Sequence, residues 1–501
     1  MSPIDLACVE RLRSLLSPSA AFNLPGDPGY SNKRWALNAE RNAAAVACPA
    51  TPEDVVQALA FAQGKAPYDS QKRLHLAVKG GGHTPSGASS SEGGLVIDLH
   101  PNMHGVRVDP DAKLAYVGGG CLWQEVDEAT APHGLASVAG IVGHTGVGGL
   151  TLGGGFGWLC SQHGLVIDNL VQATVVTSSG DILTASDSQN SDLFWALRGG
   201  GANFGVVTEF VLKLHDQRPD LYTSSESSQR SHFSLEIIIN EVNAWIRVRE
   251  VTEVAHLTFA HGPNDMPVIV LELVFNGDTE VGAKKFERFV ALGPVVNHTE
   301  TIPYVKLNHL KVAYPDFGIL QLTPAHIVQD ALAMHGTNRS LQGGFVPYVP
   351  EGIPFSFIKG VYEAWLKCVT ENPLASKSAV AMELYHPEKW SSVPPDATAF
   401  VHRKPVYNLA YVMTWSDPSF TENAGKVTLG LHQDIVDSRH AHFPAESVGE
   451  GGYTNYMDEE SRVATKDFAH RRFGDNFVRL VEIKRRYDPS GIFGRWFAST
   501  R

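Results

Sequence analysis

The stretch GVGGLTLGGGFG, residues 146–157, decides how this 501-residue chain is interpreted. More than half of its residues are glycine, and three further glycine clusters occur at 80–82, 118–120 and 199–205. Because glycine has no side chain and tolerates positive φ, such turns let the backbone approach a ligand closely and direct N–H groups at it. Short strand candidates separate the clusters, so we expect several turns along one sheet to meet a single long ligand.

The common nucleotide-binding motifs do not fit these clusters. A P-loop needs Gly-Lys-Ser/Thr at the start of a helix, but Lys79 precedes the first glycine cluster instead. A GxGxxG fingerprint counted from Gly146 meets Thr151 at its third glycine. Counted from Gly199, it meets Phe204 there. The ligand is therefore not expected to occupy an ordinary Rossmann site.

Composition excludes several classes of protein. Hydrophobic residues make up 43% of the chain, which is enough for at least two globular domains. Lysine and arginine total 41 against 53 acidic residues, so the net charge is -12, and no basic block occurs. Neither nucleic acid nor a membrane is an expected partner. The five cysteines form no CxxC pair, which predicts neither a disulfide framework nor a zinc site.

No targeting segment or metal site is predicted. Residues 1–20 lack the pattern of a signal peptide, so we expect a cytoplasmic protein. The segment RHAHF, residues 439–443, has an HxH spacing that a metal could use. No third ligand accompanies it, so we interpret it as a loop and expect no bound metal.

Beyond residue 214 the pattern changes. The polar stretch HDQRPDLYTSSESSQRSH, residues 215–232, is typical of a domain boundary or an exposed loop. Farther on, amphipathic helix candidates alternate with strands such as SAVAMELYH, residues 378–386, which predicts an α+β fold with an antiparallel sheet. On the N-terminal side of residue 214, one helix is expected to have Ser191 or Asp192 as its N-cap and to stop at Gly199.

A set of segments, taken in order, resembles one known family. They are VKGGGHTPSG (78–87), the glycine-rich stretch from GIVGHTG to SSGDIL (140–183), DLFWALRGGGANFGVVTEFVLKLH (192–215), YTNYMDEE (453–460) and YDPSGIF (487–493). Together they resemble the berberine bridge enzyme-like group of the vanillyl-alcohol oxidase flavoprotein superfamily. The resemblance implies a PCMH-type FAD-binding domain in two parts, residues 1–214 and 446–501. It implies an inserted α+β substrate domain with an antiparallel sheet at 215–445.

The resemblance also implies a covalent flavin. In the family, the histidine after the first glycine turn is bonded to the flavin ring, and His83 stands at that position. Many members have a second bond from a cysteine, but Val142 aligns there, which implies attachment through His83 only. Thr145 aligns with a residue that gates oxygen, and its valine-like shape favours oxygen as electron acceptor. The other implied contacts with FAD are Lys79, Gly80, Gly81, Gly82, Thr84, Gly87, Val142, Gly143, Gly148, Gly149, Gly157, His163, Asp168, Val175, Gly205, Val207 and Asn455. A plain core role fits Val175 and Val207 equally well.

Two candidates are left open for the catalytic base. Tyr456 matches a tyrosine that relatives place over the flavin, but a phenol with a pKa near ~10 needs about 4 kcal/mol of assistance to ionise at pH 7. Glu383 lies on a strand that resembles the flavin-facing one, and alternation puts Tyr385 on the same face. Glu383 is ionised without assistance, yet it is a weaker base unless burial raises its pKa. We favour Tyr456.

The function implied by the resemblance is oxidation of a small organic molecule at an alcohol, amine, allylic or benzylic carbon, in secondary metabolism. The substrate would lose a hydride to FAD and a proton to the base, and oxygen would then yield hydrogen peroxide. Two other functions stay open. A flavin-containing cyclase or pericyclase would make product without peroxide. A binding protein with a vestigial site is disfavoured by the presence of Tyr456 and Glu383.

Overall fold

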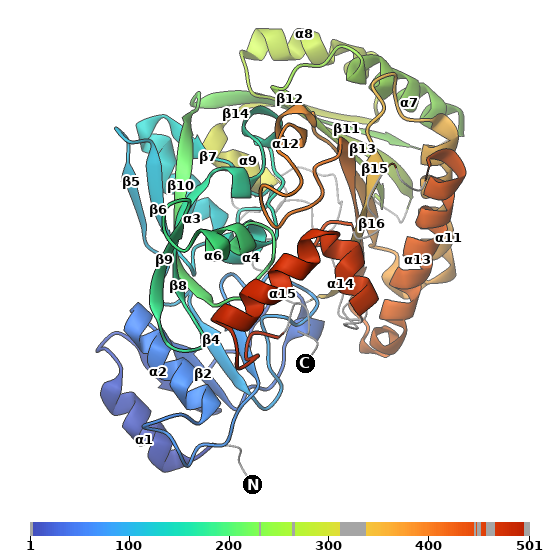
Figure 1. The fold of residues 1–501 in the computed structure, drawn as a ribbon. Helices are drawn as coiled ribbons and strands as arrows, with labels where there is room; N and C mark the ends of the chain where they lie inside the picture. The colour runs from blue at the N-terminus through green and yellow to red at the C-terminus, as the bar shows by residue number, and fades with distance from the viewer. Residues whose placement is uncertain are drawn as a thin grey trace.

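Three sheets form the framework of the protein. A computed structural model describes residues 4–229, 232–262, 266–310, 337–444, 447, 452–456 and 466–494. Figure 1 shows a four-stranded sheet at the bottom, a six-stranded sheet at the left and a seven-stranded sheet at the right. Helices and strands are largely segregated and most strand pairs are antiparallel, so the predicted α+β class with an antiparallel sheet is confirmed.

The four-stranded sheet presents the loop that carries His83. Its strands, in spatial order, are β1 (Ala21–Asn23), β2 (Ala45–Cys48), β4 (Leu95–Asp98) and β3 (Leu76–Lys79). Helices α1 (Leu6–Leu15) and α2 (Pro52–Gln63) pack on it. The sequence fixes the ends of α2, because Thr51 and Asp54 form a capping box and Gly64 adopts the left-handed conformation at the C-cap. β3 then ends at Lys79, directly before the first glycine cluster.

The six-stranded sheet carries the other glycine clusters. Its strands are β5 (Val106–Asp109), β6 (Leu114–Gly118), β10 (Val206–Asp216), β8 (Leu170–Val176) and β9 (Ile182–Ser186), with β7 (Leu135–Ser137) paired to the far end of β10. The associated helices are α3 (Trp123–Thr130), α4 (Val147–Leu152), α5 (Cys160–His163) and α6 (Ser191–Leu197). The long strand β10 pairs with three neighbours and forms the centre of this layer.

The seven-stranded sheet has two unlike faces. Its strands, in spatial order, are β14 (Val296–Pro303), β11 (Asp220–Gln229), β13 (Pro267–Phe275), β12 (Glu253–His261), β16 (Ala379–Leu384), β17 (Val406–Trp415) and β15 (Asn338–Pro347). Helices α7 (His232–Ile246), α8 (Thr279–Val290), α11 (Phe355–Glu371) and α13 (Thr421–His442) cover one face with an apolar core, and α9 (Leu307–Leu310) and α12 (Glu388–Ser391) are short connections. The opposite face, which includes Phe345, turns toward the glycine-rich layer and shares its core.

The polar stretch at 215–232 is not an exposed loop, so that interpretation was wrong. Most of it forms β11, which lies inside the sheet between β13 and β14. Ser224 and Glu226 are buried, and the Ser224 hydroxyl donates to Glu226 Oε1 at 2.6 Å. Pairing on both edges and small side chains that bond one another outweigh the weak strand propensity of serine.

Two local expectations are also corrected. α6 has Asn190 rather than Ser191 or Asp192 as its N-cap, because Asn190 adopts a left-handed conformation with φ of 46° and donates its amide to Thr184 O. The RHAHF segment is not a loop: it forms the end of α13, and Phe443 is the C-cap. Two residues apart on a helix, its histidines point in different directions.

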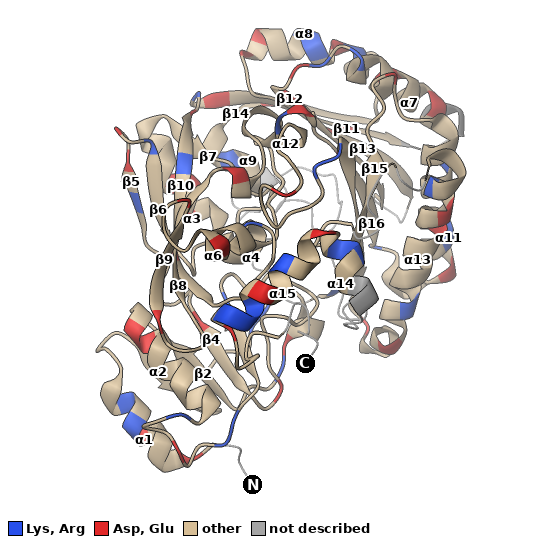
Figure 2. Ribbon diagram, in the orientation of Figure 1, with Lys and Arg blue, Asp and Glu red and all other residues tan. Residues whose placement is uncertain are grey.

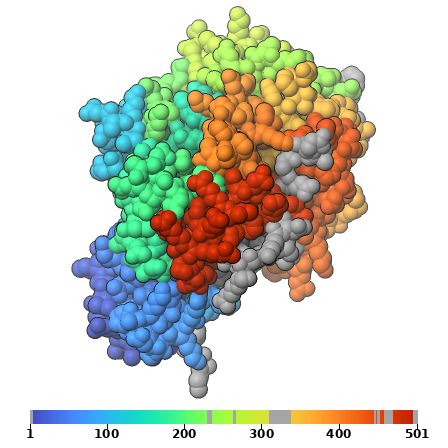
Figure 3. Space-filling model, in the orientation of Figure 1, coloured from blue at the N-terminus to red at the C-terminus, as the bar shows by residue number. Residues whose placement is uncertain are grey.

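The end of the chain returns to the glycine-rich layer. Figure 3 shows the red C-terminal helices, α14 (Lys466–Phe473) and α15 (Asn476–Tyr487), lying across green and orange parts of the surface, and Figure 2 shows the lysines and arginines that they carry. The buried Lys484 ammonium donates to Asp488 at 2.5 Å and to Asn203 O at 2.6 Å, which ties α15 to the loop before β10. The domain limits at 214/215 and 445/446 stay predictions. None of the described helices is long and apolar enough to cross a membrane.

Candidate active site

Three glycine clusters meet where the two smaller sheets adjoin. A Cβ added to Gly81 would lie 2.6 Å from Gly146 N, and one added to Gly146 would lie 2.4 Å from Gly81 N. Gly80 and Gly148 both face Gly119 O, at 3.1 and 3.3 Å from their added Cβ positions. These backbones therefore touch directly, which only glycine permits. Three of the four glycine clusters, expected along one sheet, thus meet at the junction of two sheets, and their contact with one long ligand stays a prediction.

Gly149 differs from its neighbours. A Cβ on Gly149 would meet nothing within 4 Å, and the residue is exposed, whereas the surrounding positions 146–148 are buried. The first residues of α4 thus present bare backbone to open space beside the junction of the loops. Such a surface is suited to a flat ligand that lies against the main chain.

His83 is held in a stack of rings. Its imidazole lies parallel to the Trp35 indole, with ring centroids 4.2 Å apart, and His144 flanks it at 4.9 Å. The Arg339 guanidinium lies over Trp35 at 4.5 Å and donates to Trp35 O at 2.7 Å. Since Trp35 N also donates to Gly82 O, the indole is fixed to the glycine turn itself. The stack restricts His83 to a narrow range of orientations.

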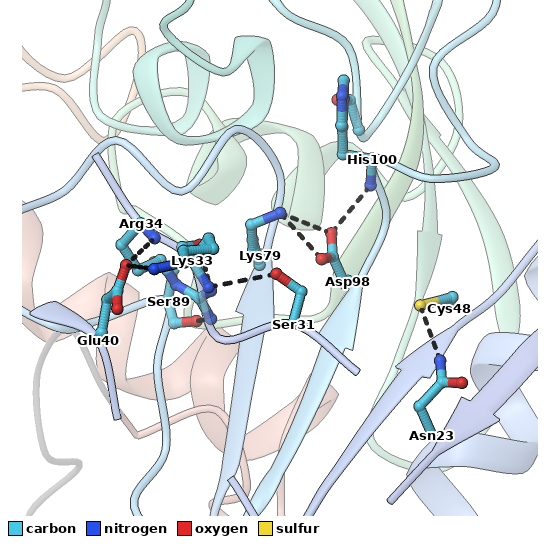
Figure 4. Close-up of polar contacts among 11 residues, drawn as sticks. Asn23, Ser31, Lys33, Arg34, Glu40, Cys48, Lys79, Ser89, Asp98 and His100 are labelled. Carbon is cyan, nitrogen blue, oxygen red and sulfur yellow. Dashed lines mark hydrogen bonds and ion pairs between the residues drawn. The ribbon is translucent and has the colours of Figure 1, made fainter. Parts of the chain in front are cut away.

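The side chains of Lys79 and Arg34 lie 3.0 and 3.1 Å from the position of a Cβ added to Gly82, and Figure 4 shows their polar contacts. Lys79 Nζ donates to both oxygens of Asp98, at 3.0 and 2.9 Å. Arg34 is 3% exposed and donates to the hydroxyl and the carbonyl of Ser89. Burial lowers the pKa of Arg34 below its usual range, but an arginine remains a cation at neutral pH. Asp98 and Glu40, whose Oε1 accepts from Arg34 N at 3.4 Å, offset part of this positive charge, and the two cations could still stabilise an anion near Gly82.

Tyr456 and Glu383 form a hydrogen bond across the opposite side of the site. Tyr456 Oη donates to Glu383 Oε1 at 2.7 Å, and Asn408 Nδ2 donates to Glu383 Oε2 at 3.1 Å. Gly343 of β15 makes room for the ring, because a Cβ there would lie 2.8 Å from the Tyr456 side chain. Both Glu383 oxygens are thus satisfied although the residue is 3% exposed.

The surroundings of Tyr456 disfavour its phenolate. Burial, and then the charge of Glu383, raise the pKa of Tyr456 well above its ordinary value. Tyr453 and Asn455 anchor the segment before it: Tyr453 Oη accepts from Gly155 N, and Asn455 Nδ2 donates to Leu150 O at 3.1 Å. The tail is therefore bound to the GGGFG stretch and presents Tyr456 to the sheet.

Tyr385 lies just beyond β16 and is buried. Its hydroxyl lies 3.2 Å from His256 Nε2, and His256 Nδ1 lies 3.6 Å from Glu272 Oε2. Burial, followed by the charge of Glu383, raises its pKa well above the ordinary value, so Tyr385 is neutral at pH 7. Alternation correctly put it on the face of Glu383, but its hydroxyl is engaged with His256.

Several residues assigned to the cofactor have other partners. His163 stacks on His215 with centroids 3.7 Å apart, and burial lowers the pKa of both to about 4. Asp168 accepts two hydrogen bonds from Arg403, each 2.8 Å long. Val175 and Val207 are register partners in β8 and β10 and are buried.

The small residues that the resemblance implies as FAD contacts also have local partners. Gly205 packs against Val175, Gly157 against Ala139 O, and Thr84 shares a hydrogen bond of 2.7 Å with Ser86. Gly87 has a positive φ of 71°. The structure brings Lys79–His83, Gly146 and Gly148 together; it does not bring His163 or Asp168 into that cluster of contacts.

Comparison with known proteins identifies the family. The family described as "FAD binding domain" matches residues 43–186, and "Berberine and berberine like" matches residues 452–495. FAD-linked oxidoreductase pgmH of Aspergillus terreus is 30% identical over 482 residues, which cover 93% of this chain and 89% of that protein. The chain belongs to the berberine bridge enzyme-like FAD-linked oxidoreductases. It is an oxidoreductase with an FAD-binding domain, as the motifs at 78–87 and 140–183 predicted.

Other members of the berberine bridge enzyme-like family extend the likeness. (R)-6-hydroxynicotine oxidase of Paenarthrobacter nicotinovorans is 40% identical over 149 residues, or 30% of this chain and 32% of that protein. Among solved structures, 6-hydroxy-D-nicotine oxidase from Arthrobacter nicotinovorans has a TM-score of 0.78 at 23% identity, covering 97% of this chain and 98% of its own. BBE-like 1 of Physcomitrella patens has a TM-score of 0.79 at 21% identity, with 97% of each chain covered. The predicted PCMH-type fold is confirmed.

The residues present fit FAD. The exposed backbone at Gly149 and the cations near Gly82 are what a flat ring system and a diphosphate require. Sequence reasoning missed Arg34, Trp35 and Asp98, which lie outside the glycine-rich motifs although they touch the His83 turn or its lysine. A basic and an aromatic residue side by side at 34–35 were the available signal, but nothing in the sequence linked them to His83.

Proposed function

We propose that this protein oxidises a small organic molecule at an alcohol, amine, allylic or benzylic carbon, using FAD attached through His83 only and oxygen as the final acceptor. FAD, when bound, supplies the two-electron acceptor of the reaction. The single observation that carries the proposal is the hydrogen bond of 2.7 Å between Tyr456 and Glu383, on the side of the site opposite the glycine junction. It is a buried, hydrogen-bonded pair that can accept a proton from a substrate as the substrate is oxidised.

Proton transfer is proposed to use both members of the pair. With its pKa raised by burial and by Glu383, Tyr456 is protonated before substrate binds. As Tyr456 Oη accepts the substrate proton, its own proton moves to Glu383 Oε1 along the existing hydrogen bond, so no free phenolate is needed. Tyr456 thus remains the group that touches substrate, and Glu383 is the final proton acceptor.

Attachment through one residue is supported by the position of the cysteines. Residues 140–157 contain no cysteine, and Val142 occupies the aligned position. Cys121 and Cys160, the nearest in sequence, are fully buried, and burial raises the pKa of Cys121 to about 12. Glucooligosaccharide oxidase from Acremonium strictum, with a TM-score of 0.75 at 21% identity and 98% of each chain covered, carries a 6-S-cysteinyl, 8α-N1-histidyl FAD. In our proposal this chain makes only the histidyl bond.

The remaining contacts with FAD follow from the geometry of the loops. We propose that Gly80–Thr84, with Arg34 and Lys79 behind them, face the diphosphate. Val142–Thr145 and Gly148–Gly149 would face the ring system, and Asn455 would hold the tail against them. Because His163 and Asp168 are engaged with His215 and Arg403, their proposed role is to position the adjoining segment.

An apolar substrate scaffold is favoured by the sheet face next to Glu383. The next cross-strand row contains Gly343, Ala410, Ala381 and Thr258, and the row beyond it contains Leu341, Val412 and Ala379. Apart from the Thr258 hydroxyl, these two rows offer no polar side chain, so most hydroxyls of a polyol there would lose water without replacement, at a cost of about 1–3 kcal/mol for each unsatisfied group. We therefore propose an aromatic or polyketide-like substrate rather than a sugar.

The test is substrate-dependent reduction of the yellow protein. Purified enzyme is mixed without oxygen with phenolic, alcohol and amine compounds, and loss of flavin absorbance is recorded. Admission of oxygen should restore the colour and release one equivalent of hydrogen peroxide per product. Product formed without bleaching and without peroxide would refute oxidation and favour the cyclase or pericyclase alternative.

A further inference from the structure

Asn308 joins three parts of the chain that are far apart in sequence. It lies in α9, shortly after β14, and is 2% exposed. Its Nδ2 donates to Asp127 Oδ2 at 2.7 Å, and its Oδ1 accepts from Trp158 Nε1 at 3.0 Å. Its main-chain oxygen accepts from Gly143 N at 3.1 Å. The buried side-chain amide of Asn308 therefore connects α3 with the residue that follows the GGGFG run, and its main-chain carbonyl adds the loop before α4.

The loop at 142–145 is held from a second side by α3. Trp123 N donates to Thr145 O at 3.0 Å, and Gln124 N donates to Gly143 O at 2.9 Å. The first N–H groups of a helix have no acceptors within it, so these bonds satisfy both the helix and the loop. Since α3 also carries Asp127, the loop, the helix and Asn308 form a closed set of contacts.

Asp127 depends on Asn308. The Asp127 side chain is 1% exposed, and within the described part of the chain its Oδ1 has no hydrogen-bond partner while Oδ2 accepts from Asn308. Removal of the amide donor would leave a buried carboxyl group unsatisfied, which strongly favours any rearrangement that admits water. Loss of the hydrogen bond between Asn308 and Asp127 should therefore also disturb the other contacts around Asn308.

The set of contacts continues to the sheet. The Trp158 ring, whose N–H is held by Asn308, stacks on His256 with centroids 4.5 Å apart. His256 in turn lies 3.2 Å from the Tyr385 hydroxyl, on the face that carries Glu383. Asn308 thus contacts the loop assigned to FAD through its main chain, and its side chain is linked through Trp158 and His256 to the sheet assigned to substrate.

We propose that Asn308 is a positioning residue that fixes the loop at 142–145, and with it the environment of the flavin ring. It touches neither substrate nor reacting atoms; it acts through Gly143 and Trp158. The inference rests on the proposed function only in assigning this loop to FAD. The hydrogen-bonded arrangement itself does not depend on whether the reaction is an oxidation.

The experiment exchanges donor and acceptor between Asn308 and Asp127. In Asn308→Asp the side chain still accepts from Trp158, but it faces Asp127 with a second carboxyl group and without the amide donor. Adding Asp127→Asn restores one donor and one acceptor in reversed order. Amide hydrogen exchange of the peptide 140–150 and the visible absorption spectrum of bound flavin are measured in both proteins and in wild type. Phe289→Leu, in the helix-covered core, serves as a control for general loss of stability.

The expected result is exchange at 140–150 that is about tenfold or more faster in Asn308→Asp, with an altered flavin spectrum, and recovery of both in the double variant. Phe289→Leu should change neither. If Asn308→Asp does not fold, Trp158→Phe, which removes the N–H donor together with part of the ring, should change both in the same direction. The proposal is overturned if exchange is unchanged, if exchange rises while the spectrum stays that of wild type, or if the double variant recovers neither. None of these outcomes depends on finding a substrate, so failure of the oxidase proposal is detected separately.

Discussion

The two sides of the site are built in different ways. The side assigned to FAD uses main chain from one continuous region, residues 79–157, in which glycine backbones touch one another. The side assigned to substrate uses side chains from distant segments, since Tyr456 and Glu383 are 73 residues apart and meet through one hydrogen bond. The first kind of site requires glycine at fixed positions, whereas the second requires only that the fold bring two polar groups together. Mutations on the FAD side should therefore mainly change flavin attachment and content, and mutations on the substrate side should mainly change the reaction rate.

The largest effect is expected for His83→Ala. If His83 makes the only covalent bond, this variant should lose all flavin on denaturation, while wild type stays fluorescent in a denaturing gel. His144→Ala is the matched control, because it removes a stacking neighbour and leaves the nucleophile in place. Flavin released from wild type by acid precipitation, or from His144→Ala but not His83→Ala, would contradict the assignment.

The second effect concerns the substrate side. Tyr456→Phe and Glu383→Gln each preserve shape, but the first removes the proton-transferring oxygen and the second the group that can finally hold the proton. Anaerobic reduction of the flavin by substrate should slow by about 10² to 10⁴ in both variants, with flavin content unchanged. A rate within threefold of wild type for Tyr456→Phe alone, with Glu383→Gln inactive, would show that Glu383 takes the proton directly.

The third effect is a dependence of the protein's stability on pH, caused by the buried Asp127 of α3, next to the FAD side. Burial raises the pKa of Asp127 from 3.8 to about 7, so the folded state keeps this proton where the unfolded chain has lost it. Stability therefore falls as pH rises from about 4 to 7, by at most about 4 kcal/mol. Asp127→Asn cannot ionise, and its gain in melting temperature over wild type should be larger at pH 8 than at pH 5. If Asp127→Asn changes the melting temperature by the same amount at pH 5 and pH 8, Asp127 is already ionised in the folded state at pH 5.

The smallest effect separates two glycines of the FAD side. Gly81→Ala should destabilise the protein with or without flavin, by about 1–3 kcal/mol, because its Cβ meets the backbone of Gly146. Gly149→Ala should leave the apoprotein as stable or slightly more stable, because alanine favours the helix and the site is open. It should nevertheless lower flavin content, measured as the absorbance ratio of flavin to protein. Full flavin content in Gly149→Ala would remove α4 from the proposed FAD surface.

Much of the framework could be predicted because glycine spacing and strand periodicity are local properties. The clusters at 80–82, 118–120 and 146–157 predicted turns with close backbone approach, and the alternation in 378–386 put Glu383 and Tyr385 on one face of a strand. The strand β11 could not be predicted, because its run of serines around Glu226 shows no alternation of apolar and polar residues, and its pairing with β13 and β14 depends on distant segments.

By itself, the sequence determined the class of protein, the FAD-binding motifs and the residues from which a base could be chosen. Only the tertiary structure decided their relations: Trp35 on His83, Glu383 on the Tyr456 hydroxyl, and Asn308 between Asp127 and Gly143. The physical reason is that a close backbone approach demands one residue type and so is written in the sequence. A hydrogen bond or a ring stack between distant segments can be made by many residue types, and it exists only once the fold has set their distance.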